Sequence, residues 1–295
     1  MEIYRTPEEC FEGLPEFACE PHYRTVEGLR LAHLDVGDGT PVLMLHGEPS
    51  WSFVWRKVIP AVRNAGYRCV VPDRAGFGRS DKPTDPAWQT LERHVKLTSS
   101  LLEDLDLRDA TVVCHDWGGP IGLTLALAHP DRISRIVILD TVIDPREPWI
   151  SEAWIRFREF IEQTDDLPVG ELMRGACYRG LADDVLAAYD APFPNLESKA
   201  AVRGLPMTVP RPDDEAALAA FDALFTDLSR DPRPILMLWG ECDLILGLAS
   251  GQRLASQIGR RIDRVIPEAG HGLQEDQGPM IGALIVDWLL QGAAS

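Results

Sequence analysis

Val-Val-Cys-His-Asp-Trp-Gly-Gly-Pro-Ile-Gly at residues 112–122 is the stretch that decides the fold of this chain. Its apolar run indicates a buried strand, Asp116 stands at the end of that strand, and the glycines open a helical pattern. This is the strand, sharp turn and helix of a nucleophile elbow, with a carboxylate where an esterase carries serine. A carboxylate there can displace a leaving group from saturated carbon and form an alkyl ester. The alternative is that Asp116 simply caps the helix.

Two further strand ends carry the residues that such a nucleophile requires. Residues 234–240 form an apolar run that is followed by Asp243, and residues 262–267 form another that is followed by His271. In open α/β sheets reactive groups collect outside the carboxyl ends of the strands. Nucleophile, acid and histidine therefore occur in the chain order expected for this fold. Taken singly, Asp243 is an ordinary turn residue and His271 an ordinary core or surface histidine.

The remaining N-terminal segments alternate between strand and helix patterns. We predict an antiparallel hairpin within residues 22–39, strands over 42–46, 69–73 and 135–140, and helices over 51–65 and 91–105. Such alternation indicates an α/β protein with a mostly parallel sheet that is covered by helices on both faces.

The pattern changes between residues 144 and 233, where prolines are frequent and strand patterns give way to helical ones. Helical periods occur at 152–163, 183–189 and 214–228, and the strand pattern resumes at Pro234. We therefore predict a core domain formed by residues 1–143 and 234–295 and an inserted helical lid formed by residues 144–233. Long connections are usually functional, although an excursion without a role is the alternative.

Composition narrows the class of protein. The 295 residues include 46 acidic and 29 basic side chains, a formal charge of −17 that disfavours nucleic acid and anionic membrane as partners. No apolar stretch approaches the roughly 20 residues that cross a bilayer. The first residues lack the basic and apolar regions of a signal peptide. The six cysteines show no framework spacing, so we expect a reduced, cytoplasmic protein.

The segment His46-Gly47-Glu48-Pro49 follows the strand that is expected to neighbour the nucleophile strand. Hydrolysis of an ester on Asp116 generates an oxyanion that needs backbone N–H donors. The amides of Glu48 and Trp117, one from each turn, are the expected pair. An ordinary strand-end turn is the alternative reading of this segment.

These motifs resemble those of the haloalkane dehalogenases of the α/β-hydrolase superfamily, particularly their first subfamily. The resemblance extends over nearly the whole chain. The matching segments are residues 46–52, 55–60, 76–83, 115–119, 188–194 and 270–276. The elbow is shared with epoxide hydrolases, whereas the Glu48 variant of the first loop and the segment 189–194 are more specific.

The resemblance implies an α/β-hydrolase fold and hydrolytic dehalogenation of a haloalkane to a primary alcohol and halide. Asp116 is then the nucleophile, His271 the general base that activates water, and Asp243 the acid that orients His271. Trp117 places its indole N–H beside the departing halide. The implied partners are a small halogenated hydrocarbon, water and halide ion, with no cofactor and no metal; the oligomeric state stays open.

One departure from the family concerns the second halide donor, which in this subfamily is a lid tryptophan. The expected position falls on Phe157, which has no N–H. Trp154 lies about one helical turn earlier and is our candidate for halide binding, while Trp149 lies farther back. The alternatives are that Tyr178 takes this place or that the halide site is weakened. The loop 73–76 also carries Arg74 and Ala75 where apolar residues are expected.

Three other functions compete. An epoxide hydrolase uses the same nucleophile, but it needs lid tyrosines that donate to the epoxide oxygen, and the lid holds Tyr178 and Tyr189 alone. A fluoroacetate dehalogenase clamps its substrate with arginines near the nucleophile, where this chain has Trp117. A non-catalytic binding protein of the same fold usually lacks a member of the triad, and this chain has all three.

Overall fold

The computed structural model describes residues 1–141, 151–210 and 213–293, and its main sheet has the strand order β10-β9-β8-β7-β4-β5-β3-β2. The strands of this sheet are β2 (Pro21–Val26), β3 (Leu29–Val36), β4 (Pro41–Leu45), β5 (Arg68–Pro72), β7 (Ala110–His115), β8 (Ile133–Leu139), β9 (Ile235–Gly240) and β10 (Arg264–Ile266). Strands β10 to β5 pair in parallel, whereas β3 and β2 pair antiparallel at one edge. The predicted hairpin and the mostly parallel sheet are confirmed.

Alternation along the central strands sorts the core onto two faces, because successive strand side chains point to opposite sides. Val42 and Met44 of β4 join one hydrophobic cluster, whereas Leu43 and Leu45 join the other. The same division holds for the neighbouring strands. Since both faces are apolar, helices must cover both.

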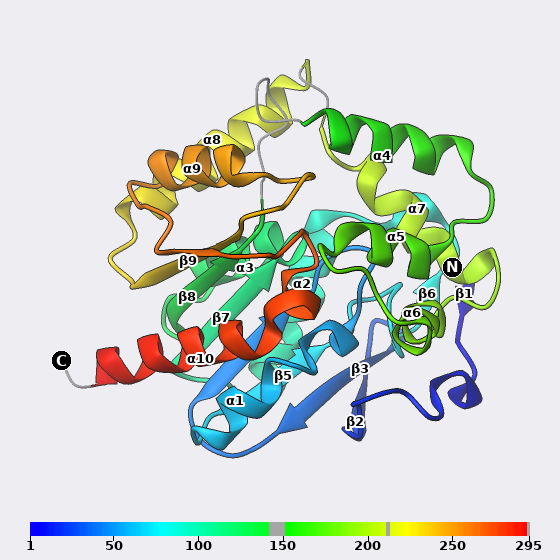
Figure 1. The fold of residues 1–295 in the computed structure, drawn as a ribbon, viewed down its shortest axis with the longest axis horizontal. Coiled ribbons are helices and arrows are strands. Elements are labelled where there is room, and N and C mark those ends of the chain that lie inside the picture. Colours follow the sequence, from blue (N-terminus) through cyan, green and yellow to red (C-terminus); the bar gives the residue numbers. More distant parts are fainter. Residues whose placement is uncertain (142–150, 211–212, 294–295) are drawn as a thin grey trace.

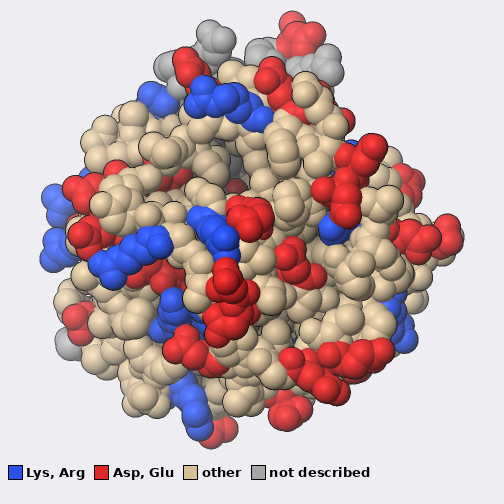
Figure 2. Space-filling view, turned by 45° about the vertical axis from the view of Figure 1, so that its right-hand side comes forward, with Lys and Arg blue, Asp and Glu red and all other residues tan. Residues whose placement is uncertain are grey.

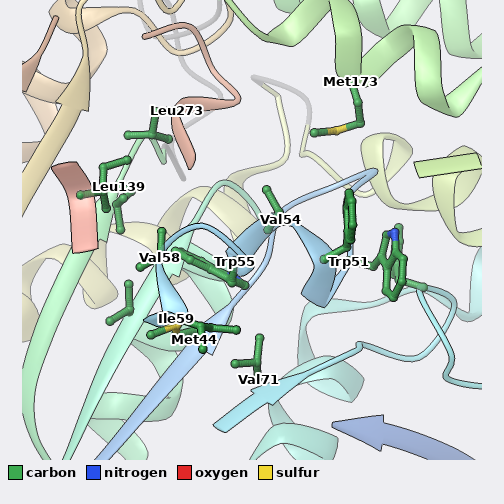
Figure 3. Packing of buried hydrophobic residues seen from close by; sticks show 14 of the residues in the cluster. Met44, Trp51, Val54, Trp55, Val58, Ile59, Val71, Leu139, Met173 and Leu273 are labelled. Carbon is green, nitrogen blue, oxygen red and sulfur yellow. The ribbon is translucent and has the colours of Figure 1, made fainter. Parts of the chain in front are cut away.

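Helices α1 (Ile59–Asn64) and α10 (Leu273–Ala293) cover one face and pack against each other, as Figure 1 shows. The cluster beneath them places Met44 beside Val58 and Ile59 (Figure 3). Helices α2 (Leu91–Asp104), α3 (Gly118–Ala128) and α9 (Leu248–Gln257) cover the opposite face.

The predicted helix over residues 51–65 is wrong in its extent. The structure has a 3₁₀ turn, η2 (Ser52–Trp55), and then the short helix α1. Trp51, Phe53 and Trp55 are all fully buried, so this segment is apolar on every side, unlike a surface helix with one apolar stripe. Further 3₁₀ turns are η1 (Glu8–Phe11), η3 (Pro86–Trp88) and η4 (Glu197–Lys199), and β1 (Ile3–Tyr4) pairs with β6 (Lys82–Pro83).

Five helices lie between β8 and β9 in the sequence, within the described part of that segment. They are α4 (Glu152–Gln163), α5 (Val169–Ala176), α6 (Asp183–Asp190), α7 (Ala200–Met207) and α8 (Glu215–Arg230). Figure 1 shows α4, α5 and α7 grouped to one side, above the sheet. The three helical periods found in the sequence correspond to α4, α6 and α8, whereas α5 and α7 were not foreseen.

Helix α8 leaves this group. Its residues Phe225 and Leu228 are buried in the core cluster of the α3 face, and the helix packs against α3 and α9. The chain is thus returned to the sheet before β9 begins.

Helices α5 and α6 are tied to the core by hydrogen bonds. The indole of Trp51 donates to the Ala188 carbonyl (3.2 Å), and the amide of Gly272 donates to the Ala176 carbonyl (2.9 Å). The Tyr189 hydroxyl donates to Glu275 at the start of α10 (2.5 Å). In Figure 3 Met173 of α5 lies above Val54 in the apolar cluster that joins the two parts.

Over the described residues, no helix has both the length and the apolar character needed to cross a membrane. Figure 2 shows carboxylate and basic side chains interspersed on one face of the molecule, around a hollow in the surface.

Candidate active site

Asp116 stands at the tip of a sharp turn between β7 and α3. Its φ is +51°, in the left-handed region that non-glycine residues seldom adopt. The small residues after it are required by close packing: a Cβ on Gly118 would lie 2.3 Å from the Leu45 carbonyl oxygen. A Cβ on Gly119 would collide with Thr141, whose hydroxyl donates to the Asp116 carbonyl (2.7 Å). The turn is therefore held from both sides.

Each oxygen of the Asp116 carboxylate has its own partner. The backbone N–H of Glu48 donates to Oδ1 (2.7 Å), and Nε2 of His271 lies 3.4 Å from Oδ2. Gly47 is needed for this approach, because a Cβ there would lie 2.5 Å from the Cβ of Asp116. Burial favours the neutral acid, yet the hydrogen bond and charge of His271 hold the pKa of Asp116 below its ordinary value. Asp116 is therefore ionised at neutral pH.

His271 follows β10 and is oriented by Asp243, which follows β9. Nδ1 of His271 lies 2.9 Å from Oδ2 of Asp243, and the other oxygen accepts the amides of Ile245 (2.7 Å) and Leu246 (2.9 Å). Burial opposes the charged imidazolium, but Asp243 and Asp116 outweigh it and raise the pKa of His271 well above its ordinary value. The structure thus brings together the three residues singled out in the sequence: Asp243 is hydrogen-bonded to His271, and His271 is in ion-pair contact with Asp116.

A second histidine, which the sequence interpretation missed, supports the first. Nε2 of His115 lies 2.9 Å from the carbonyl oxygen of His271, and the two rings are 4.9 Å apart. Burial lowers the pKa of His115 to about 4, so its ring is neutral and donates to that carbonyl. Its place directly before Asp116 on β7 was the signal that could have identified it.

Asp140 was missed as well. It follows β8, so it stands at the same edge of the sheet as the three residues found, and it is completely buried. A ligand atom of Asp140, one of Asp243 and one of His271 lie within 4.8 Å of one another. This is the group within the described residues whose composition suits a metal ion, but His271 Nδ1 and Asp243 Oδ2 already engage each other.

A cavity of about 330 Å³ lies over the carboxylate of Asp116. Strand-end loops contribute Glu48, Trp117 and His271 to its wall, and the inserted helices contribute mostly apolar side chains, among them Trp154, Phe157, Phe160, Leu172 and Met173. Trp154 and Phe157 thus both face the site, as their spacing on α4 allows. Tyr178 is 53% exposed and is not part of this wall, and Trp149 lies outside the described residues.

Arg74, one of the departures from the family pattern, is buried beneath the site. Its guanidinium lies over the Phe77 ring at 4.7 Å, and its three nitrogens have no hydrogen-bond partner within the described residues. Burial lowers the pKa of Arg74 to about 10, while the charges of Asp116 and Glu48 act in the opposite direction. Burial together with the charge of Asp116 raises the pKa of the Glu48 carboxyl well above its ordinary value. Ala75 is a buried core residue without a visible part in the site.

Comparisons with known proteins agree with this geometry. A family model described as the alpha/beta hydrolase fold matches residues 40–277. A haloalkane dehalogenase of Psychrobacter cryohalolentis is 36% identical over 98% of this chain and 98% of its own length. One from Mycobacterium marinum is 37% identical over 98% of this chain and 100% of its own length.

Among solved structures, the tetrameric haloalkane dehalogenase DpaA from Paraglaciecola agarilytica superposes with a TM-score of 0.88. It is 35% identical, and the match covers 96% of this chain and 97% of the other. On the fold, the carboxylate at the elbow and these full-length relatives, the chain belongs to the haloalkane dehalogenase family of α/β-hydrolases.

Proposed function

We propose that this protein is a hydrolase that cleaves carbon–halogen bonds in haloalkanes and yields an alcohol and a halide ion. The observation that carries the proposal is the ionised carboxylate of Asp116 at the elbow, beneath an apolar cavity of about 330 Å³. A carboxylate attacks saturated carbon and leaves an ester that water can cleave. Full-length relatives named haloalkane dehalogenase support the same reaction.

In the proposed first step, Oδ2 of Asp116 attacks the carbon that bears the halogen. The new C–O bond forms as the carbon–halogen bond breaks, and the halide leaves with the bonding pair. Oδ1 stays on the N–H of Glu48, which leaves the other oxygen to react. The indole of Trp117, which lines the cavity, is the proposed donor to the halide, and Trp154 is the proposed second donor.

In the proposed second step, His271 takes a proton from water, and the resulting hydroxide attacks Cγ of the ester. Negative charge then develops on Oδ1, where the amide of Glu48 already donates and the amide of Trp117 is the proposed second donor. Collapse of this intermediate expels the alkoxide, which takes the proton from His271. The alcohol departs and leaves Asp116 as a carboxylic acid, which passes its proton to His271 and through it to solvent, so that Asp116 regains its carboxylate. Asp243 stabilises the charge that His271 carries in between.

The cavity wall argues against the epoxide hydrolase alternative. That reaction needs tyrosine hydroxyls aimed at the substrate oxygen, since an alkoxide leaves less readily than a halide. Tyr178 lies outside the wall, and the hydroxyl of Tyr189 is engaged with Glu275.

We further propose that residues 144–233 act as the lid of this site and that the protein works in the cytoplasm. The wall contributed by α4 and α5 supports the lid. The six cysteines, which are all free, suit a reducing compartment.

The deciding experiment offers the enzyme 1-bromobutane and 1,2-epoxybutane in parallel and measures bromide and diol. We expect bromide release and no diol. Diol without bromide would replace the proposal by an epoxide hydrolase, and neither product with either substrate would indicate a protein that only binds.

A further inference from the structure

Asp140 is a third carboxyl group at the triad, and the proposed reaction gives it no task. It follows β8, between the strands that carry Asp116 and Asp243, and its exposed fraction is 0%. Oδ1 accepts the amide of Gly240 (2.8 Å). Oδ2 receives no hydrogen bond from an N–H or O–H donor of the described residues. Space there is tight, because a Cβ on Gly240 would lie 2.8 Å from Oδ2. A buried carboxylate oxygen without a donor is costly unless it carries a proton itself.

The neighbours of Asp140 supply an acceptor for that proton. A carboxyl oxygen of Asp140, a carboxyl oxygen of Asp243 and a ring nitrogen of His271 lie within 4.8 Å of one another. Asp243 faces it from the end of β9 and His271 from the end of β10. On the β7 side, Asp116 and His115 face His271 rather than Asp140.

Asp243 is the better placed of the two carboxyls to hold a negative charge. It accepts two backbone amides and pairs with His271, whereas Asp140 accepts one amide. Two carboxylates this close in a dry site do not both ionise.

We propose that Asp140 keeps its proton at neutral pH and donates it to Asp243, so that Asp140 is a positioning residue for the acid of the triad. Burial and the charge of Asp243 raise the pKa of Asp140 well above its ordinary value, while the pKa of Asp243 is held below its own by His271. The two carboxyls then carry a single negative charge between them.

This hydrogen bond changes how readily His271 acts as a base, and this part of the inference rests on the proposed function. Donation from Asp140 draws charge away from Asp243 and weakens the hold of Asp243 on the proton of His271. The pKa of His271 is therefore lower than it would be without Asp140. Since His271 must be neutral to accept a proton from water, hydrolysis continues at lower pH than it would without Asp140. Removing the donor moves the acid limb of the hydrolysis step to higher pH.

The first test needs no substrate. In the infrared spectrum of the folded enzyme at neutral pH, we expect a carbonyl band of a protonated carboxylic acid that shifts in D₂O and vanishes in Asp140→Asn. Glu48 and Asp73 are also buried carboxyls with a raised pKa, so Glu48→Gln and Asp73→Asn are the matched controls, and the band survives both. If Asp140→Asn does not fold, the double variant Glu48→Gln/Asp73→Asn is measured instead, and a band that remains in this variant belongs to Asp140.

Absence of such a band overturns the proposal. So does a metal ion that mass spectrometry finds in the folded enzyme and that is lost in Asp140→Asn, because a cation would then occupy the place of the proton.

The second test follows hydrolysis of the Asp116 ester against pH in single turnovers. Asp140→Asn keeps a donor toward Asp243, so we expect its rate within about threefold of the wild type and an unmoved acid limb. Asp140→Ala removes the donor, and the limb moves up by about one pH unit, the shift expected when one hydrogen bond to a charged group is lost. A limb that moves equally in both variants, or in neither, contradicts the proposal. If the wild type releases no halide, the proposed function fails, and the infrared result still decides the state of Asp140.

Discussion

The charge of Asp116 changes during the proposed reaction, and His271 lies close enough to respond. In the resting enzyme Nε2 is 3.4 Å from Oδ2, and Asp243 and Asp116 together raise the pKa of His271. Ester formation removes the negative charge of Asp116, so the pKa of His271 falls. The fraction of neutral His271, the form that can accept a proton from water, therefore rises once alkylation is complete.

Replacing His271 by phenylalanine separates the two steps. Attack by Asp116 on a bromoalkane needs no base, so we expect His271→Phe to release about one bromide per enzyme and to keep the alkyl group on Asp116. Intact-protein mass spectrometry after incubation with 1-bromobutane detects the added butyl mass. Asp116→Ala is the control and gains no mass. Continuous turnover in His271→Phe, or an alkyl group at another residue, would refute the two-step scheme.

The pH dependence of the two steps differs in a defined direction. At pH values above the lowered pKa of Asp116, titration of that carboxyl does not change the rate of the halide burst, because the nucleophile is already ionised. Hydrolysis slows as the pH falls through the pKa that His271 has in the alkyl-enzyme. This pKa is lower than the pKa of His271 in the resting enzyme. Rapid-quench measurement of bromide and butanol between acidic and alkaline pH gives both limbs. Equal profiles for the two products contradict the assignment of His271.

At the scale of elements, periodicity predicted helices α2, α4, α6 and α8, whereas it missed α5 and α7 and gave the wrong extent for the helix at 51–65. The sheet, the elbow and the order Asp116, Asp243, His271 follow from apolar runs and what comes after them. Helices α5 and α7 were not predicted because each contains a glycine. The glycine is required by close packing, but it lowers the helix propensity of the segment. A Cβ on Gly204 would lie 2.3 Å from the Pro86 carbonyl oxygen, and one on Gly170 would collide with Leu186.

Of the residues that the structure brings together at the candidate site, the sequence pointed to Asp116, Asp243 and His271 and missed His115 and Asp140, for a related reason. Asp116 and His271 stand out because their neighbours form a turn motif. Asp140 ends a strand like many surface aspartates, and its burial against Asp243 is set by strands far apart in the sequence. Likewise, whether Trp154 or Phe157 faces the cavity depends on how α4 is seated, and the structure places both in the wall.

Helix α4 carries the prediction for halide binding. If the indole of Trp154 donates to the halide, Trp154→Phe removes a hydrogen bond of roughly 1.5–3 kcal/mol to a charged group and slows halide release by about 10- to 100-fold. Chlorides suffer more than bromides, because the poorer leaving group depends more on stabilisation. Phe157→Trp adds a donor in the same wall and tightens bromide binding, which fluorescence quenching measures.

Trp88→Phe is the matched control for that experiment, since Trp88 lies outside the cavity wall. Unchanged rates and unchanged quenching in Trp154→Phe would make Trp154 a packing residue of the lid.

The contact between α6 and α10 carries a prediction for stability. The Tyr189 hydroxyl donates to Glu275, a buried carboxylate that also pairs with Arg56 and Lys57. Tyr189→Phe leaves Glu275 one donor short and lowers the free energy of unfolding by about 1–3 kcal/mol. Urea denaturation at neutral pH measures it. Tyr23→Phe, which breaks an exposed hydrogen bond to Glu8, should change it by less than about 0.5 kcal/mol. Similar values for the two variants contradict a structural role of the Glu275 cluster.

For the whole molecule, the formal charge of −17 bears on which substrates reach the cavity. A neutral haloalkane feels little of this field, so we expect kcat/KM for 1-bromobutane to be independent of ionic strength. The anion 4-bromobutanoate is repelled, and added salt screens the repulsion. Its kcat/KM should rise roughly twofold to tenfold between 10 and 200 mM sodium acetate, a salt that avoids added halide. The same slope for both substrates would show that the surface charge plays no part.

One hydrogen bond joins α5, which lines the cavity, to the loop that carries His271. The amide of Gly272, the residue after His271, donates to the carbonyl of Ala176 at the end of α5. Any movement that withdrew α5 to widen the entrance would pull on the backbone of the base as well. We therefore expect hydrolysis to require the arrangement in which α5 is in place, because displacement of α5 would shift His271 away from Asp116 and from the water that it activates in the proposed reaction.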